Sequence, residues 1–129
     1  MTPVPIKLVD LMTAYQGSAL IGTAVESGLA DLLAEGPLTL DEIVAKLGTD
    51  DHGTMALLAG LASYELVERD EDRFSLTGLG APLAGSHPET VAQIVLKEWF
   101  FYKLWAEMPV SNVSLRAALS GWLMFRFQH

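Results

Sequence analysis

The side chains that most often do chemistry in proteins are sparse in this sequence and stand apart from one another. The three histidines, His52, His87 and His129, are scattered, and none has a second metal ligand at helical spacing. Two carboxylate pairs, Asp41-Glu42 and Asp50-Asp51, stand where helices are expected to begin, and helix capping accounts for both. The sequence therefore predicts no catalytic residue and no metal ligand.

The glycine patterns also fail to indicate a nucleotide or acyl-transfer site. Gly78-Leu79-Gly80 follows a strand candidate, but it lacks the strand–helix–strand context in which such a turn binds phosphate. The longer patterns Gly-x-Gly-x-x-Gly and Gly-x-Ser-x-Gly do not occur. We therefore predict no cofactor-binding residue in this chain, and we do not expect the chain to catalyse a reaction alone.

The aromatic cluster Trp99-Phe100-Phe101-Tyr102 is the most unusual group of residues in the sequence. It lies in a long helix expected from Pro88 to about Met108, in which consecutive residues point about 100° apart. One core cannot cover four consecutive aromatic side chains, so a second surface is required. A partner chain, a ligand, and the C-terminal segment folding back are the three alternatives.

A second apolar segment, residues 115–127, has only Arg116 and Arg126 as charged residues. A helix that is apolar on nearly all sides has to be buried, and a chain of 129 residues offers few places for it. We therefore predict a homodimer interwoven through its terminal helices. The predicted interface residues are Trp99, Phe100, Phe101, Trp122 and Phe125.

The segment Leu38–Leu66 predicts a helix-turn-helix. Thr39 and Glu42 have the spacing of a capping box at the start of the first helix, and Gly48 suits its end. Thr49, Asp50 and Asp51 each offer an N-cap oxygen for a second helix, which is expected to run to Leu66.

A β-hairpin is expected directly after this pair of helices. Strand candidates at 67–69 and 73–76 flank the charged turn Asp70-Glu71-Asp72, and together they form the wing of a winged helix. The helix that would enter a DNA groove has no Lys or Arg between Asp51 and Leu66, and the wing tip is acidic. We therefore predict no nucleic-acid partner, with a winged-helix transcriptional regulator as the runner-up.

The remaining pattern indicates one mainly helical domain. A first helix is expected to begin with the apolar residues between Ile6 and Met12 and to continue until Gly17-Ser18 interrupts it. A second is expected from Ala19 to Ala34, with Gly28 packed closely inside it. The net charge of −8, the absence of cysteine and the lack of an apolar run of roughly 18 residues favour a cytoplasmic chain without a membrane partner.

Several stretches together resemble a known family. The segment AVESGLADLLAEGPLTLDEIVAKLG (residues 24–48) is similar to the N-terminal dimerisation domain of S-adenosylmethionine-dependent O-methyltransferases of the plant phenolic and actinobacterial polyketide-tailoring type. Residues 57–69 and FSLTGLG (residues 74–80) continue the similarity, and Trp105-Ala-Glu-Met resembles the end of the long helix in that family.

The resemblance implies residues 1–108 as a winged-helix-like dimerisation domain that roofs a small aromatic substrate pocket. Residues 109–129 are then a C-terminal apolar helix packed on that domain or on its partner. The residues expected to line the substrate are Tyr102, Trp105 and Met12. The methyl-donor domain and its S-adenosylmethionine site have no counterpart here, so we expect a fragment, a truncated relative or a stand-alone module, with a separate chain as a possible source of that domain. A small-molecule binding protein is a third alternative.

Overall fold

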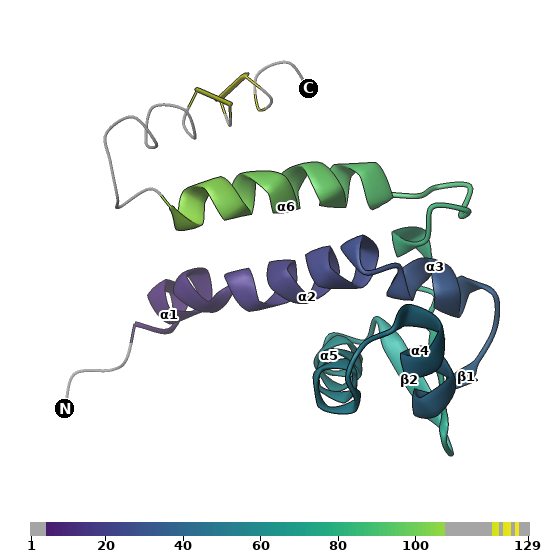
Figure 1. Ribbon diagram of the computed structural model, residues 1–129. Helices are drawn as coiled ribbons and strands as arrows, with labels where there is room; N and C mark the ends of the chain where they lie inside the picture. The colour runs from purple at the N-terminus through teal and green to yellow at the C-terminus, as the bar shows by residue number, and fades with distance from the viewer. Residues whose placement is uncertain (1–4, 108–119, 122, 125, 127–129) are drawn as a thin grey trace.

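The computed structural model describes residues 5–107, 120–121, 123–124 and 126. The helices in this part of the chain are α1 (Ile6–Thr13), α2 (Tyr15–Glu26), α3 (Leu29–Ala34), α4 (Leu40–Leu47), α5 (Asp51–Ser63) and α6 (Ala92–Ala106), with a short 3-10 helix, η1 (Ala81–Leu83). The strands are β1 (Leu38–Thr39), β2 (Val67–Asp70) and β3 (Arg73–Leu76). Figure 1 shows two regions: α3, α4, α5 and the sheet gather at one end, while α1, α2 and α6 extend away from them. We call the first region (residues 29–83) the winged-helix body and the second (α1, α2 and α6) the helical arm.

The helix-turn-helix forms through the caps that the sequence predicts. The Thr39 hydroxyl accepts a hydrogen bond of 3.2 Å from the Glu42 backbone N–H, and it donates one to the Glu42 carboxylate. Gly48 ends α4 in the left-handed conformation, with φ of 68°. Glycine adopts this conformation without steric strain because it has no Cβ atom. The Asp50 carboxylate then accepts from Gly53 N–H at 2.7 Å and starts α5. These three features place α4 and α5 against each other.

The second helix of this pair is shorter than predicted, because it ends at Ser63 and does not reach Leu66. Glu65 has φ of 61°, which a continuing helix does not allow, and its carbonyl accepts a 2.6 Å hydrogen bond from the Thr77 hydroxyl. This turn brings the chain directly into β2. The predicted hairpin is confirmed, with Val67 opposite Leu76 and Asp70 opposite Arg73.

The sheet has a third strand that the sequence analysis missed. β1 pairs antiparallel with β3, so that Leu38 lies opposite Phe74, and the strand order is β1-β3-β2. With only two residues, β1 is too short to show an alternating pattern. The predicted mainly helical winged helix-turn-helix is otherwise confirmed.

The predicted helix boundaries before residue 35 are wrong in two places. The first interruption falls at Ala14, and Gly17 and Ser18 lie inside α2. The predicted single helix from Ala19 to Ala34 is divided at Gly28, which has φ of 87°. Because glycine adopts this left-handed conformation without strain, Gly28 turns the chain between α2 and α3 instead of packing inside a helix.

The long aromatic helix starts later than predicted. α6 begins at Ala92, whose backbone N–H donates to the Thr90 hydroxyl at 3.1 Å, and Pro88 lies in the preceding turn. A proline is compatible with the first turn of a helix but does not require one, which is why its position misled the prediction.

The core of the winged-helix body is closed. Its largest fully buried side chains are those of Leu29, Ile43, Leu58 and Leu61. In the arm, α2 packs along α6, whereas α1 has no buried residue. No helix among the described residues is both long and apolar enough to cross a membrane.

Candidate functional site

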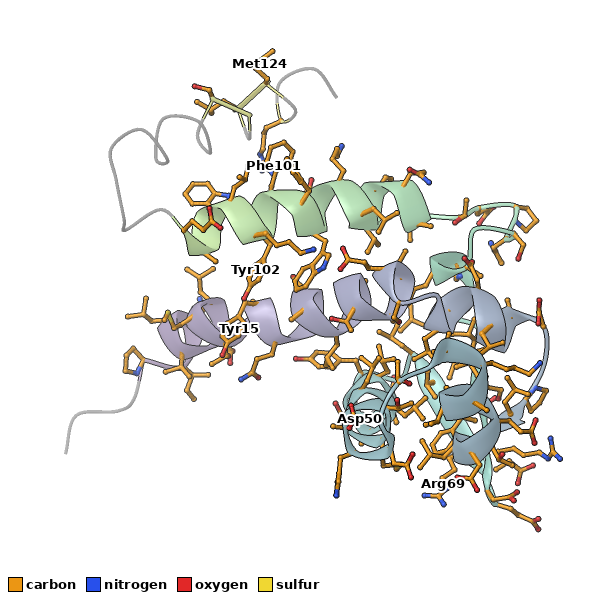
Figure 2. All side chains as sticks on the ribbon, in the orientation of Figure 1. Tyr15, Asp50, Arg69, Phe101, Tyr102 and Met124 are labelled. Carbon is orange, nitrogen blue, oxygen red and sulfur yellow. The ribbon has the colours of Figure 1, made fainter. Side chains whose placement is uncertain are left out.

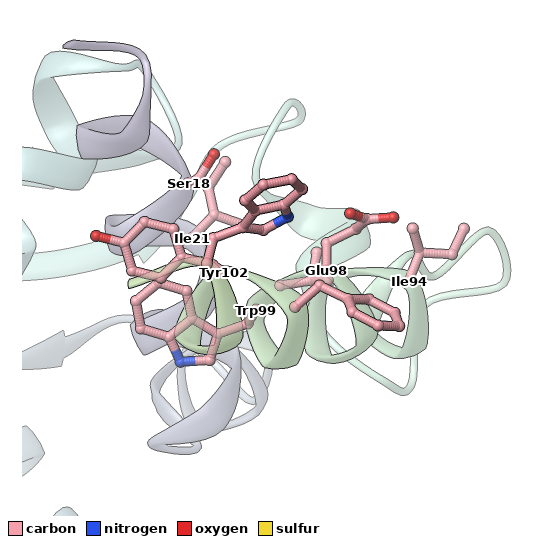
Figure 3. Close-up of a pocket in the computed structure, with 9 residues that line it drawn as sticks. Ser18, Ile21, Ile94, Glu98, Trp99 and Tyr102 are labelled. Carbon is pink, nitrogen blue, oxygen red and sulfur yellow. The ribbon is translucent and has the colours of Figure 1, made fainter. Parts of the chain in front are cut away.

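A pocket of about 400 Å³ lies between α2 and α6. Two α2 residues and seven α6 residues line it (Figure 3): Ser18, Ile21, Ile94, Val95, Glu98, Trp99, Phe101, Tyr102 and Trp105. The α6 members Ile94, Glu98, Tyr102 and Trp105 follow one another at spacings of four, four and three residues, which places them along one side of the helix. The pocket is thus one side of α6 facing α2.

Two aromatic rings of α6 lie in the contact between α2 and α6. The rings of Trp99 and Tyr102 are stacked, with centroids 4.8 Å apart and planes 9° from parallel. The Trp99 indole lies so close to α2 that a Cβ at Gly22 would be 2.5 Å from its Cδ2 atom. Gly22 therefore permits the approach of α6, and the sequence analysis did not identify this role.

An ion pair holds the two helices together beside the same indole. The Lys103 ammonium donates to both carboxylate oxygens of Glu26, at 2.8 and 3.2 Å, and lies 5.5 Å from the centre of the Trp99 ring. The hydrogen bond from Lys103 has the largest effect on the Glu26 carboxyl and lowers its pKa. Desolvation opposes this to a smaller extent, and the charge of Lys103 lowers the pKa further. Both charged side chains are about half exposed, so the pair orients α6 more than it stabilises the fold.

The polar groups of the pocket are few. Ser18 and Glu98 are exposed, which places them at its mouth, and the Trp99 indole N–H is buried without an acceptor among the described residues. None of the nine lining residues is Lys, Arg or His. Stacked rings with a hydroxyl and a carboxylate at the opening are suited to binding a flat apolar molecule. Among the described residues, no three His, Asp or Glu side chains gather into a metal site.

The structure brings two of the three predicted substrate-lining residues together. Tyr102 and Trp105 both line the pocket, and Figure 2 shows Tyr102 on the side of α6 that faces α2. Met12 is not among the lining residues and is 75 % exposed on α1. Contact of any of the three with a substrate stays a prediction.

The predicted interface residues are in different environments. Phe101 is buried, and a Cβ on Gly121 would be 2.8 Å from its ring, so the chain's own C-terminal part covers it. This corresponds to the fold-back alternative for that one ring. Phe100 is 58 % exposed, whereas Trp99 packs toward α2. Trp122 and Phe125 lie outside the described residues, as does most of the predicted segment 109–129, and the interface role of all five stays a prediction.

The most exposed apolar surface belongs to α1. Among the described residues, its side chains make no extended contact with another element, and the exposed apolar ones are Ile6, Leu8, Val9, Leu11 and Met12. Tyr15, at the start of α2, continues this surface and is 48 % exposed. Exposed apolar patches of this kind mark sites of association in soluble domains.

The structure is therefore a winged-helix domain with two long packed helices, α2 and α6, and the exposed apolar helix α1. Comparison with known proteins then gives the family. The model of the O-methyltransferase dimerisation domain matches residues 9–86, and the chain belongs to this family. The resemblance inferred from the sequence is thereby confirmed.

Individual relatives agree with this assignment. The chain is 40 % identical to the N,N-dimethyltransferase OxyT of Streptomyces rimosus over 67 residues, which are 52 % of this chain and 20 % of OxyT. It is 33 % identical to the O-methyltransferase SfmM3 of Streptomyces lavendulae over 79 residues, 60 % of this chain and 24 % of SfmM3. The structure of an O-methyltransferase family protein from Burkholderia thailandensis superposes with a TM-score of 0.72 at 25 % identity, covering 84 % of this chain and 33 % of that one. The chain thus spans about a fifth to a quarter of the length of these two curated relatives.

Proposed function

We propose that this chain is a noncatalytic dimerisation module of O-methyltransferase type. It joins two copies through α1 and through the side of α6 that carries the exposed Phe100. The observation that carries the proposal is α1 itself, which has no buried residue although five of its eight side chains are large and apolar. Burial of such surface gains about 25 cal/mol for each Å². No other described element packs extensively on α1, so we assign this burial to a second copy of the chain. The family name supports the same role.

Sedimentation of two variants tests this proposal. Leu11 is 75 % exposed, and Leu11→Glu places a charge on the apolar side of α1, so we expect this variant to sediment as a monomer where the unmodified chain is a dimer. Lys7→Gln is the matched control, because it makes the same change of net charge on the same helix without removing apolar surface. An unmodified chain that stays monomeric at micromolar concentration would overturn the proposal.

We place the methyl-transfer chemistry outside these 129 residues. The named relatives are methyltransferases, and the chain matches only 20 to 24 % of their length, so S-adenosylmethionine and the catalytic groups are assigned to a further domain or chain. In that assembly the α2–α6 pocket serves as one wall for a small aromatic substrate. The proposed location is the cytoplasm, which suits a chain without cysteine.

The pocket also supports a small-molecule binding role that does not depend on an enzyme. Its volume of about 400 Å³ and its stacked rings suit a bicyclic aromatic molecule. The transcriptional regulator has less support, because the cationic side chains of the wing are engaged within the chain. Arg69 donates to the Glu71 carbonyl at 2.8 Å and lies over the Phe74 ring, and Arg73 donates to the Pro37 carbonyl. Binding to duplex DNA at low salt would contradict our preference.

A further inference from the structure

We propose that the α2–α6 pocket prefers flat aromatic ligands that carry a positively charged amine, and that Glu98 is the residue that sets this preference. The inference rests on the proposed ligand-binding role of the pocket and adds to it the charge of the ligand. It follows from three features of the site: its charge, its spacing along α6 and its aromatic faces.

The charge at the pocket is negative. Glu98 is the only Asp, Glu, Lys, Arg or His among the nine lining residues. Lys103, on the same helix, is bound to Glu26 at 2.8 Å. Neither Lys103 nor Lys97 lines the pocket. The net charge of −8 strengthens attraction of cations at long range. A carboxylate or phenolate ligand would therefore meet a like charge without a neutralising partner in the lining.

The spacing along α6 places this charge at a useful distance from the aromatic rings. Glu98 precedes Tyr102 by four residues, so the two lie one turn apart, about 5–6 Å, on the same side of the helix. A fused ring seated against Tyr102 and Trp105 therefore brings an aminomethyl substituent within reach of the Glu98 carboxylate. Because Glu98 is exposed, its side chain has room to turn toward a ligand in the pocket. Figure 3 shows the Glu98 carboxylate among the lining side chains.

The aromatic faces favour the same kind of ligand. Indole and phenol rings attract cations through their negative faces, most strongly for indole. The chain already uses this interaction, because the Lys103 ammonium lies 5.5 Å from the centre of the Trp99 ring. Trp105 and Tyr102 add further rings to the lining. A charged amine thus gains from the rings and from Glu98, whereas a neutral ring gains from stacking alone.

Three naphthalenes of nearly equal size test the proposal by isothermal titration calorimetry on the full chain. They are 1-naphthylmethylamine, a cation at pH 7, 1-naphthylmethanol, which is neutral, and 1-naphthoate, an anion. We expect the amine to bind about fivefold more tightly than the alcohol, as is typical of an exposed charge pair, and naphthoate to bind most weakly. The advantage of the amine should shrink with added salt.

The variants Glu98→Gln and Glu89→Gln assign the preference to one residue. Glu98→Gln should remove most of the advantage of the amine over the alcohol and leave only the part that comes from the rings, while the alcohol binds as before. Glu89→Gln removes the same charge three residues before α6 and outside the pocket lining, and it should leave the preference intact. Equal binding of the three compounds to the unmodified chain, or a preference for naphthoate, would overturn the charge assignment and leave the pocket as a ligand site. Failure of all three to bind would overturn the ligand role itself, and the sedimentation test of dimerisation is independent of both results.

Discussion

The winged-helix body and the helical arm bury their apolar side chains to very different extents. In the body, Ile43 and Leu58 are completely inaccessible to solvent, and Thr39, Gly48 and Asp50 cap both ends of α4 and the start of α5. In the arm, α1 buries nothing, and α6 buries only Ala92 and Phe101 out of fifteen residues. The body thus buries its own core, whereas the described part of the arm leaves much of its apolar surface exposed, and this exposed surface is what the proposed dimer would cover.

Truncation of a body residue should give the largest effect. Leu58→Ala removes a side chain that is 0 % exposed, and the lost contacts and the remaining cavity should lower the free energy of unfolding by about 2–5 kcal/mol. Urea unfolding of the monomeric form measures this loss. The same truncation on the arm, Leu11→Ala, should leave the unfolding of a monomer nearly unchanged. Equal losses from the two variants would erase the distinction between the regions.

Adding a methyl group to Gly22, where Trp99 approaches α2, should have an intermediate effect that is confined to the arm. Gly22→Ala places a Cβ 2.5 Å from the indole, so Trp99 has to shift away from α2. Overpacking costs about 1–3 kcal/mol, and the better helix propensity of alanine offsets about 1 kcal/mol of that. We expect the near-ultraviolet circular dichroism of the stacked rings to decrease.

A neighbouring substitution is the control for this change. Thr23→Ala alters the next residue of α2, which is exposed, and it should leave the aromatic signal as it is. An unchanged signal in Gly22→Ala would mean that α6 does not depend on this close approach.

The ion pair between Glu26 and Lys103 should give the smallest effect. Its hydrogen bond lowers the pKa of Glu26 in the folded chain below the ordinary value of 4.5, so the folded state binds the proton less readily than the unfolded state does. The stabilisation is therefore present above pH 4.5 and is lost as the pH falls through the lowered pKa. Comparing the thermal midpoints of the chain and of Lys103→Met from pH 7 to pH 3 should show a small difference that disappears in acid. A difference that grows in acid would have the wrong sign for this pair.

The sequence predicted the body far better than the arm, and the reason is physical. Thr39, Gly48 and Asp50 act on backbone atoms within three or four residues of themselves, so their spacing in the sequence is enough to predict the caps. The arm depends on contacts between segments that are about 75 residues apart, such as Gly22 with Trp99. The pattern of either segment alone does not indicate such a contact.

The same difference applies to the candidate site. Tyr102 and Trp105 were predicted from the family resemblance, and both line the pocket. Glu98 was missed, although its position four residues before Tyr102 was a signal available in the sequence. Met12 was chosen from the resemblance alone, and it lies on the exposed α1 away from the pocket lining.

Gly80 belongs to a Gly-x-Gly motif that suggests nucleotide chemistry, but the fold requires this glycine for a steric reason. A Cβ on this residue would collide with the backbone carbonyl of Leu66, which also accepts the Thr77 N–H at 3.1 Å. Natural selection for a correctly folded single protomer is thus sufficient to preserve this glycine. Its retention during divergence would identify descent from a shared domain, and it would say nothing about whether a descendant still methylates anything.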